Sequence, residues 1–335
     1  MDPAQFFAAS RVVIVAGKGG VGKTTVSAAL ARAAALAGLS TLIIEVEGKS
    51  GLATLFGQSP FDYGEVELSA GGGPDGAADV RARTLTPDDA LLEYLEDHGM
   101  SRISRRLVTS GAVDMVATAA PGIKDILILG KVKQLEQKRG ADLIVLDAPA
   151  AGHAISFLRS ARGLTDAVRV GPINTQARDV LELLTDPARC QVILVTLPEE
   201  TPVNELVETA YSLEDEVGVS LGPVVVNGLY PELAGLDADP VEAARSAGAV
   251  LRTGEAEALA HAAGFRRHRM DLQAQQVARL AEVLPLPQLA LPFLFDADLG
   301  PTHIDLLAAG LLAGIAGLTP LPAEAEPEAE PGAGA

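Results

Sequence analysis

Short runs of consecutive apolar residues recur along the chain and alternate with longer stretches in which apolar residues return at helical spacing. A run that is apolar at every position is typical of a parallel strand buried on both faces of a sheet. Such runs predict strands at residues 12–16, 41–46, 143–147, 192–196 and 224–227. Because the stretches between them are long enough for crossover helices, the pattern predicts an α/β fold with a doubly wound, mostly parallel sheet flanked by helices.

Two regions depart from this alternation. Residues 65–69 and 80–85 carry weaker strand patterns on either side of a glycine-rich turn, which predicts a hairpin or a small addition to the sheet. Residues 87–139 show helical spacing without a strand and predict a helical insertion, which either covers one end of the sheet or recognises a substrate or partner. The apolar stretch 306–318 is shorter than the roughly 20 residues that cross a membrane, so it predicts a buried helix.

Composition narrows the range of functions. The 335 residues carry a formal net charge of −18, which repels phosphate backbones and argues against a nucleic-acid partner. The single Cys190 excludes, within one chain, a disulfide, a zinc ribbon and a cysteine-held iron–sulfur cluster. No cationic start and apolar stretch follow Met1, so we expect no signal peptide and a soluble, cytoplasmic protein. Residues 320–335, rich in Pro, Glu, Ala and Gly, predict a disordered acidic tail.

A phosphate-binding motif follows the first predicted strand. Residues 17–24 read G-K-G-G-V-G-K-T and match G-x-x-x-x-G-K-[ST], with a helix expected from Lys23 to about residue 37. Glycines let backbone N–H groups converge on a phosphate, and the helix N-terminus adds partial positive charge. Lys23 would reach the β- and γ-phosphates and the Thr24 hydroxyl would bind Mg²⁺. The alternative is a glycine-rich turn without a ligand.

The motif therefore predicts a site for ATP or ADP with Mg²⁺. Its nucleotide-binding residues are Gly17, Lys18, Gly19, Gly20, Val21, Gly22, Lys23, Thr24 and Thr25. Asp147 ends a buried strand, where an open α/β sheet places its ligand groups, and is the second candidate Mg²⁺ ligand beside Thr24. A surface aspartate is the alternative, although four apolar residues precede it. We expect residues 1–319 to form a single P-loop ATPase domain, with a helical subdomain at about 87–139.

The extended motif, G-K-G-G-V-G-K-T-T at residues 17–25, resembles the deviant Walker A motif shared by ArsA-type ATPases, septum-site and partitioning ATPases and nitrogenase iron proteins. In those families the extra lysine crosses a dimer interface, so the resemblance implies that Lys18 acts on the partner's nucleotide. Residues 147–153 resemble the D-T-A-P-T-G-H segment of the ArsA family, and residues 197–200 resemble its L-P-E segment. Asn227 stands where that family reads the adenine edge, with turn chemistry before Gly228 as the alternative.

Over roughly residues 10–315 the chain is similar to bacterial ArsA-like homologues of the ATPase that targets tail-anchored membrane proteins. Glu47 stands where the eukaryotic member has the aspartate that positions the attacking water, so the resemblance implies that role for Glu47. The alternative is that Glu45 or Glu47 only supports the loop. No C-x-x-C is present, which removes the dimer-clamping zinc of the eukaryotic protein, and the thiols of the metalloid site are absent as well.

The resemblance implies a dimeric Mg²⁺-dependent ATPase, either a homodimer or a heterodimer with a paralogous ATPase. Lys18, Lys23 and Glu47 would be its catalytic residues. Its nucleotide cycle would switch the dimer around a client, for which a membrane protein is one candidate. The alternative is an ATPase subunit that energises an anion or metalloid exporter. The acidic tail argues against a septum-site switch, which carries a basic amphipathic end. The cysteine count excludes a nitrogenase-like reductase.

Overall fold

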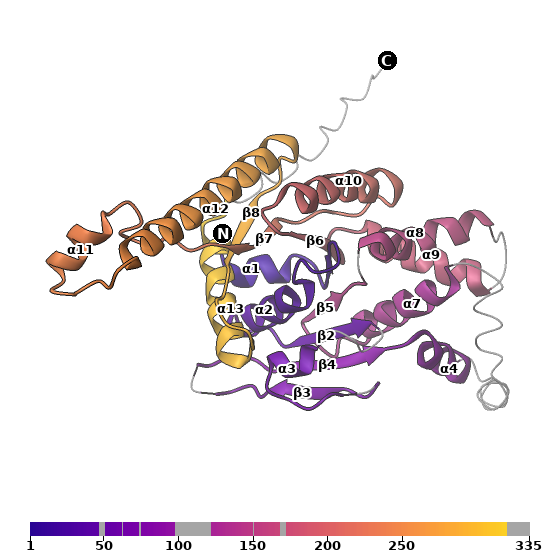
Figure 1. Cartoon of the computed structure of the whole chain (residues 1–335). Coiled ribbons are helices and arrows are strands. Elements are labelled where there is room, and N and C mark those ends of the chain that lie inside the picture. The colour runs from indigo at the N-terminus through magenta and orange to yellow at the C-terminus, as the bar shows by residue number, and fades with distance from the viewer. Residues whose placement is uncertain are drawn as a thin grey trace, which may run out of the picture.

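A computed structural model describes residues 1–46, 51–61, 63–73, 75–97, 122–149, 151–167 and 172–319. An eight-stranded sheet with the order β3-β4-β2-β5-β1-β6-β7-β8 runs through the middle of the molecule (Figure 1). The strands are β1 (Val12–Ala16), β2 (Thr41–Val46), β3 (Val66–Ser69), β4 (Val80–Leu85), β5 (Leu143–Asp147), β6 (Cys190–Thr196), β7 (Val224–Leu229) and β8 (Gln288–Pro292). All neighbours pair in parallel except β3 and β4, which form the predicted antiparallel hairpin. The predicted α/β class and its five buried strands are confirmed.

Helices cover both faces of the sheet. One face packs against α1 (Pro3–Ala8), α2 (Lys23–Leu36), α3 (Leu52–Leu55) and α13 (Pro301–Ala316). The other packs against α7 (Ile123–Lys138), α8 (Ala151–Ala167), α9 (Pro172–Thr185) and α10 (Glu200–Glu216). Along β1, Val12 and Ile14 face the second layer while Val13 and Val15 face the first. This double burial explains why the central strands read as unbroken apolar runs.

The helical insertion is described in part. Its first helix, α4 (Pro87–Asp97), packs against α7, and α7 also contacts α8 and α9. The middle of the predicted insertion, residues 98–121, lies outside the described residues, as does the predicted tail at 320–335. The buried helix expected at 306–318 is α13, but only one of its faces is buried, because Leu306 is exposed while Leu307 and Leu311 are not.

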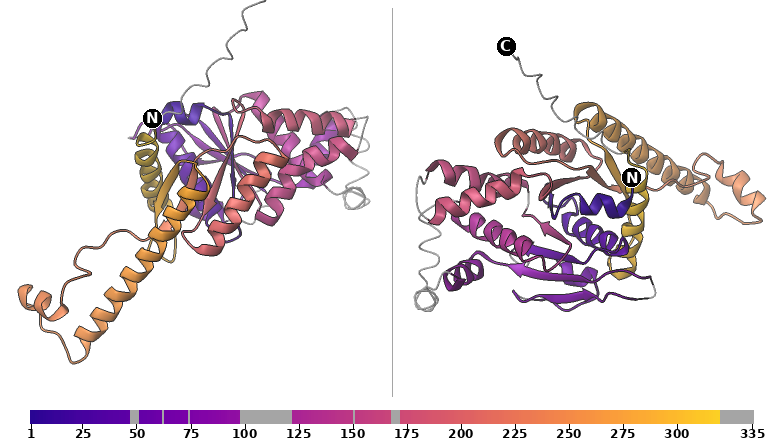
Figure 2. Two further views of the ribbon diagram at one scale, coloured as in Figure 1. Left: turned by 90° about the horizontal axis from the view of Figure 1, so that it is seen from above. Right: turned by 180° about the vertical axis from the view of Figure 1, so that it is seen from behind.

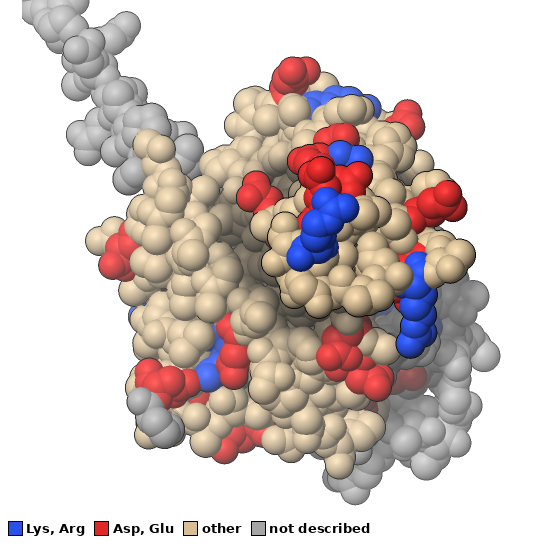
Figure 3. Space-filling model, turned by 60° about the vertical axis from the view of Figure 1, so that its left-hand side comes forward, with Lys and Arg blue, Asp and Glu red and all other residues tan. Residues whose placement is uncertain are grey.

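An extended segment between β7 and β8 was not predicted. It contains α11 (Pro240–Ser246) and the 29-residue α12 (Glu255–Val283). Helix α11 and the N-terminal part of α12 project from the body of the molecule (Figures 1 and 2). With this end of the molecule turned forward, charged side chains form small clusters on a largely uncharged surface (Figure 3). Among the described residues, no helix has both the length and the apolar character needed to cross a lipid bilayer.

Candidate nucleotide-binding site

The phosphate-binding motif lies at the centre of the sheet. Strand β1 pairs with β5 on one side and β6 on the other, and the loop from Gly17 to Gly22 joins it to α2. A Cβ atom at Gly17 would lie 2.4 Å from the carbonyl oxygen of Val195 in β6, so only glycine lets the loop leave β1 this close to its neighbour. The sheet therefore fixes where the loop begins.

At the other end of the loop, the N-terminus of α2 has no side-chain cap. Gly22 is the N-cap of α2 with a φ of 89°, and no side chain caps the helix. A Cβ atom at Gly22 would lie 2.3 Å from Nδ2 of Asn227, which adds a second reason for glycine there. Gly19 and Gly20 are exposed, and Lys23 to Thr25 in the first helical turn are half-buried. Uncapped N–H groups at a helix start form an anion-binding site, so the loop fits a phosphate.

Lys23 folds back over the loop. Its Nζ donates a hydrogen bond to the carbonyl oxygen of Lys18 at 3.1 Å. Burial lowers the pKa of Lys23, and the negative charge of Asp147 partly opposes that shift. The ammonium group thus lies over the same loop whose glycines are exposed, where it can neutralise a bound phosphate.

The side chains of Thr24 and Asp147, the two candidate Mg²⁺ ligands, contact each other. Asp147 ends β5 opposite Val15 of β1, and its Oδ2 accepts a hydrogen bond from Oγ1 of Thr24 at 2.7 Å. The carboxyl group is 6% exposed, and burial raises its pKa to about 6, against the opposing effects of the Thr24 hydrogen bond and the Lys23 charge. A hydroxyl and one carboxylate beside a phosphate cradle form the kind of oxygen site that Mg²⁺ occupies. The residues present therefore fit Mg²⁺ bound together with nucleotide phosphates.

Two further polar side chains belong to this site. Ser27 lies one turn after Thr24 on α2, and its Oγ donates to Oδ1 of Asp147 at 3.3 Å. Glu45 of β2 lies opposite Asp147 in the sheet, is 5% exposed and accepts a hydrogen bond from Oγ1 of Thr84 at 3.1 Å. The charge of Glu45 contributes to the raised pKa of Asp147. In the sequence, Ser27 can be recognised by its helical spacing from Thr24. Glu45 can be recognised as a carboxylate inside an otherwise apolar strand.

Lys18 lies beside the phosphate cradle. Its Nζ forms an ion pair with Oε1 of Glu205 on α10, and the two side chains are 40% and 38% exposed. The Glu205 carbonyl oxygen accepts a hydrogen bond from Thr209 Oγ1 at 2.7 Å, one turn further along α10. In this arrangement the side chain of Lys18 is held at the surface by α10.

The remaining predicted site residues are not all brought together. Asn227 of β7 donates a hydrogen bond from Nδ2 to the carbonyl oxygen of Val21 at 2.9 Å, so it contacts the loop directly. Its role toward adenine stays a prediction. Glu47 lies outside the described residues, and so do the side chains of residues 151–154 in the segment that follows Asp147. Water positioning by Glu47 therefore also stays a prediction.

Comparison with known proteins places the chain in a family. Residues 10–171 match a model of the anion-transporting ATPase family, ArsA. ATPase BagA of Mycobacterium tuberculosis is 33% identical over 313 residues, which cover 88% of this chain and 90% of that protein. The chain belongs to the ArsA-type anion-transporting ATPase family. It is therefore an ATP-hydrolysing enzyme, and the resemblance inferred from its motifs is confirmed.

More distant relatives are similar to this ArsA-type ATPase over part of its sequence. A Halobacterium salinarum protein that bears the name of an arsenical pump-driving ATPase is 27% identical over 235 residues, which cover 67% of this chain and 36% of that protein. The ATPase get3 of Schizosaccharomyces japonicus is 28% identical over 178 residues, which cover 50% of this chain and 52% of that protein.

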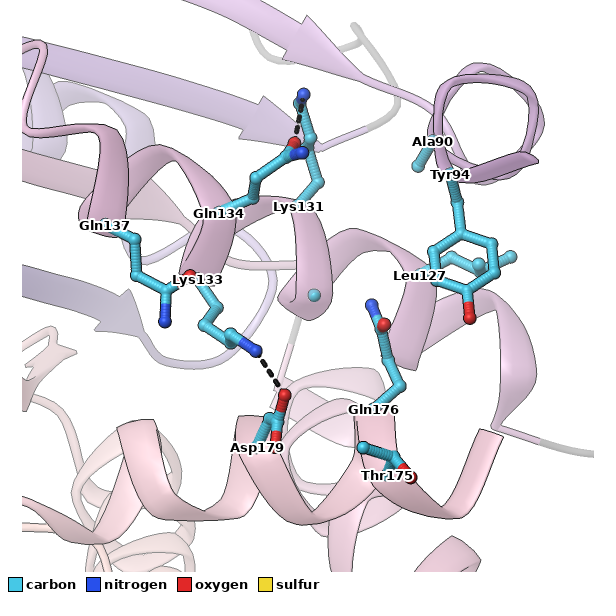
Figure 4. Close-up of a pocket in the computed structure, with 11 residues that line it drawn as sticks. Ala90, Tyr94, Leu127, Lys131, Lys133, Gln134, Gln137, Thr175, Gln176 and Asp179 are labelled. Atoms are coloured by element: carbon cyan, nitrogen blue, oxygen red, sulfur yellow. Dashed lines mark hydrogen bonds and ion pairs between the residues drawn. The ribbon is translucent and has the colours of Figure 1, made fainter. Parts of the chain in front are cut away.

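A cleft of this ArsA-type ATPase lies in the helical insertion, between α4, α7 and α9, and has a volume of about 320 Å³ (Figure 4). Lys131 forms an ion pair with Glu93 and a hydrogen bond of 2.6 Å with Gln134. Lys133 forms an ion pair with Asp179 across the cleft. These pairs join α7 to α4 and to α9. We interpret the cleft as a polar junction of the insertion, separate from the nucleotide site.

Proposed function

We propose that this ArsA-type ATPase binds Mg²⁺·ATP with the phosphates on the backbone of residues 17–25 and hydrolyses it as a dimer. The observation that carries the proposal is the convergence of Lys23, Thr24 and Asp147 at the open start of α2, with 2.7 Å between the Thr24 hydroxyl and the Asp147 carboxylate. Three groups from two different elements meet at the position where a phosphate chain would lie. A glycine-rich turn that binds no ligand would not explain why these three groups converge.

Each of these groups has a chemical role in the proposal. Backbone N–H groups of the loop and the first turn of α2 bind the phosphates, and Lys23 neutralises charge on their β- and γ-oxygens. Thr24 and Asp147 would hold Mg²⁺, which supplies further charge neutralisation when bound. Ser27 and the buried environment fix the orientation of the Asp147 carboxylate. The site is thereby preorganised for charge that develops on the phosphates.

The dimer part of the proposal depends on Lys18. Its side chain is held at the surface by Glu205. A charge beside the cradle is useful to phosphoryl transfer if it reaches the nucleotide of a facing subunit. A positive group supplied in trans can accelerate such a reaction by about 10³–10⁵-fold. Within this proposal the partner is a second copy or a paralogous ATPase, and Glu47 positions the water, with Glu45 as the alternative.

The dimer would couple its nucleotide cycle to a client, and a membrane protein is one candidate. The similarity to the ATPase get3 relatives supports an ATPase cycle of the kind that this family shares, and the client belongs to the proposal. The pump-driving name of the halobacterial relative supports the second candidate function, an ATPase subunit of an anion or metalloid exporter. The absence of further cysteines beside Cys190 argues against arsenite itself as cargo.

Substitution of Lys23 tests the nucleotide site. We expect Lys23→Ala to lower ATP turnover by about 10²–10³-fold, because one preorganised positive group is lost from the phosphate site. Turnover is measured by release of inorganic phosphate at saturating Mg²⁺·ATP. Lys138→Ala, in the last turn of α7 and away from the loop, is the matched control and should keep wild-type turnover. Undiminished hydrolysis by Lys23→Ala would reject this assignment.

A further inference from the structure

Lysine is scarce in this chain and is concentrated on α7. The chain has seven lysines beside nineteen arginines, and four of the seven lie on α7. Those four are Lys124, Lys131, Lys133 and Lys138, and the other three are Lys18, Lys23 and Lys49. Lysine presents a compact ammonium group on a flexible stem, a role that arginine does not replace. Lys131 and Lys133 both line the cleft between α4, α7 and α9 (Figure 4).

The two lysines of the cleft keep hydrogen-bond donors in reserve. A lysine ammonium group has three N–H donors, and within the described residues Nζ of Lys133 contacts only Asp179. Burial lowers the pKa of Lys131; pairing with Glu93 opposes this shift, and the charges of Lys138 and Arg83 lower the pKa further. The surroundings of Lys131 therefore include other cations, and a ligand that brings negative charge and hydrogen-bond acceptors suits this end of the cleft.

A glutamine amide lies over a glycine of α7 inside the same cleft. A Cβ atom at Gly130 would lie 1.7 Å from Nε2 of Gln176, so α7 makes room for this amide by having no side chain there. Glycine in a helix interior is less favourable than alanine. Gln176 is half-buried and makes no hydrogen bond within the described ranges. The packing of α7 against α9 thus holds an unpaired amide in the cleft, where a ligand can accept its N–H group.

The opposite end of the cleft is apolar. Ala90 and Tyr94 of α4 lie there beside Leu127 of α7, away from the ammonium group of Lys133 (Figure 4). The volume of about 320 Å³ is at the lower end of the range of small-molecule sites. The cleft therefore suits a small ligand that has an anionic head and an apolar body.

We infer that this cleft binds a carboxylate carried on a short apolar body. The carboxylate oxygens accept hydrogen bonds from Nζ of Lys133 and Nε2 of Gln176, and the body packs against Tyr94 and Leu127. A small organic acid and the C-terminal residue of a peptide both present this chemistry. The site goes beyond the proposed function, because the described residues that line it are separate from the nucleotide site.

Two matched ligands test the need for a carboxylate. N-acetyl-leucine has the anionic head and the apolar body, and N-acetyl-leucinamide has the same shape without the charge. With the full chain in ligand-observed NMR, we expect N-acetyl-leucine to bind saturably with a dissociation constant on the order of 1 mM, as suits so small a ligand. The amide should bind about tenfold more weakly or not at all. No saturable binding, or equal binding of the two ligands, overturns the inference.

Two lysines of the same helix provide the matched variants. Lys133→Gln should raise the dissociation constant of N-acetyl-leucine about tenfold or more, because a hydrogen bond from a charged group is lost. Lys138→Gln removes the same charge from the last turn of α7, outside the cleft, and should change the constant by about twofold or less. Gln176→Leu keeps the charges of the cleft and should also weaken binding, about fivefold. Equal constants for Lys133→Gln and Lys138→Gln overturn the inference.

Lys23→Ala separates the cleft from the phosphate loop, which is a second place where a carboxylate can bind. We expect this variant to bind N-acetyl-leucine as the wild type does, whatever its ATP turnover. Binding that is lost in Lys23→Ala places the ligand at the nucleotide site and overturns the inference. Hexanoate carries the same charge without a peptide unit and distinguishes the two sources. Tighter binding of N-acetyl-leucine assigns the cleft to a peptide C-terminus, and equal or tighter binding of hexanoate assigns it to a free organic acid.

Discussion

At the residue scale, the burial of the Asp147 carboxyl group has the largest consequence for the stability of the free protein. It is 6% exposed, and burial raises its pKa to about 6 even though Thr24 and Ser27 donate hydrogen bonds to it. An ionised carboxylate in this position is costly to the free protein, and a bound divalent cation would offset that cost. The site is therefore less stable than it could be when it holds no metal, which is common where a protein binds a charged ligand.

The raised pKa of Asp147 predicts how stability depends on pH. Its folded pKa of about 6 lies above the unfolded value of about 3.9, so the folded state holds the proton more tightly. The protonated Asp147 side chain therefore stabilises the folded state below pH 4, and this contribution is lost as pH rises from about 4 to 6. In Asp147→Asn the free energy of unfolding should not fall over this pH range. Above pH 6, without Mg²⁺ or nucleotide, the variant should be more stable than wild type by about 1–3 kcal/mol. Urea denaturation between pH 4 and 8 measures the difference.

The matched control for this prediction is Asp215→Asn, an exposed position on α10. Its unfolding curves should follow those of the wild type at each pH. The prediction for Asp147 is wrong if Asp147→Asn keeps the wild-type loss of stability between pH 4 and 6. The same variant should bind Mg²⁺·ATP poorly, because the amide no longer attracts the cation.

The sequence predicts some of these residue contacts and not others. Lys23, Thr24 and Asp147 could be assigned because a motif fixes the first two and the end of a buried strand fixes the third. The ion pair between Lys18 and Glu205 could not, because it joins positions 187 residues apart, and only the packing of α10 beside the loop brings them together.

At the element scale, the burial of a strand or helix determines whether its hydrophobic pattern can be recognised in the sequence. Strand β1 is buried on both faces and gives an unbroken apolar run, which the sequence shows clearly. Strand β8 lies at the edge of the sheet, where buried and exposed positions alternate, and its five residues lack that signal. The segment between β7 and β8, with α11 and the start of α12, gave no signal either, because its large apolar residues are exposed and its alanines fit either a core or a surface helix.

The ion pairs of the helical insertion predict how its helices are held together. The Lys131 side chain is 4% exposed and its partner Glu93 is 29% exposed, so Lys131→Met takes the nearer cation from a half-buried carboxylate, which keeps only Arg83 at 4.0 Å. We expect a loss of about 2–4 kcal/mol in the free energy of unfolding. Lys133→Met is the matched control, and its loss should be about 1 kcal/mol or less because its partner Asp179 is 39% exposed.

Urea denaturation measures both variants at pH 7. The double variant Glu93→Gln with Lys131→Met should recover part of the loss, because no carboxylate is then left without the Lys131 ammonium group. Equal losses for Lys131→Met and Lys133→Met would contradict this account of the junction.

At the scale of the whole molecule, the proposed function needs two subunits whose nucleotide sites face each other, so that Lys18 of one subunit reaches the nucleotide of the other. The body of the protein is strongly acidic, so a close approach of two nucleotide sites requires a favourable interaction to offset repulsion. In this account that interaction is the bond between Lys18 and the partner's phosphates, and Glu205 holds the lysine until then.

A mixture of two inactive variants tests the central claim that Lys18 acts across the dimer. Lys18→Ala should keep ATP affinity close to wild type and lose hydrolysis, while Lys23→Ala loses both. In a mixed dimer the Lys18→Ala subunit binds ATP and its Lys23→Ala partner still supplies an intact Lys18. The account predicts that phosphate release returns in the mixture to a level well above that of either variant alone. A mixture that stays inactive, although both variants fold and associate, would show that Lys18 acts within its own subunit and would contradict the account.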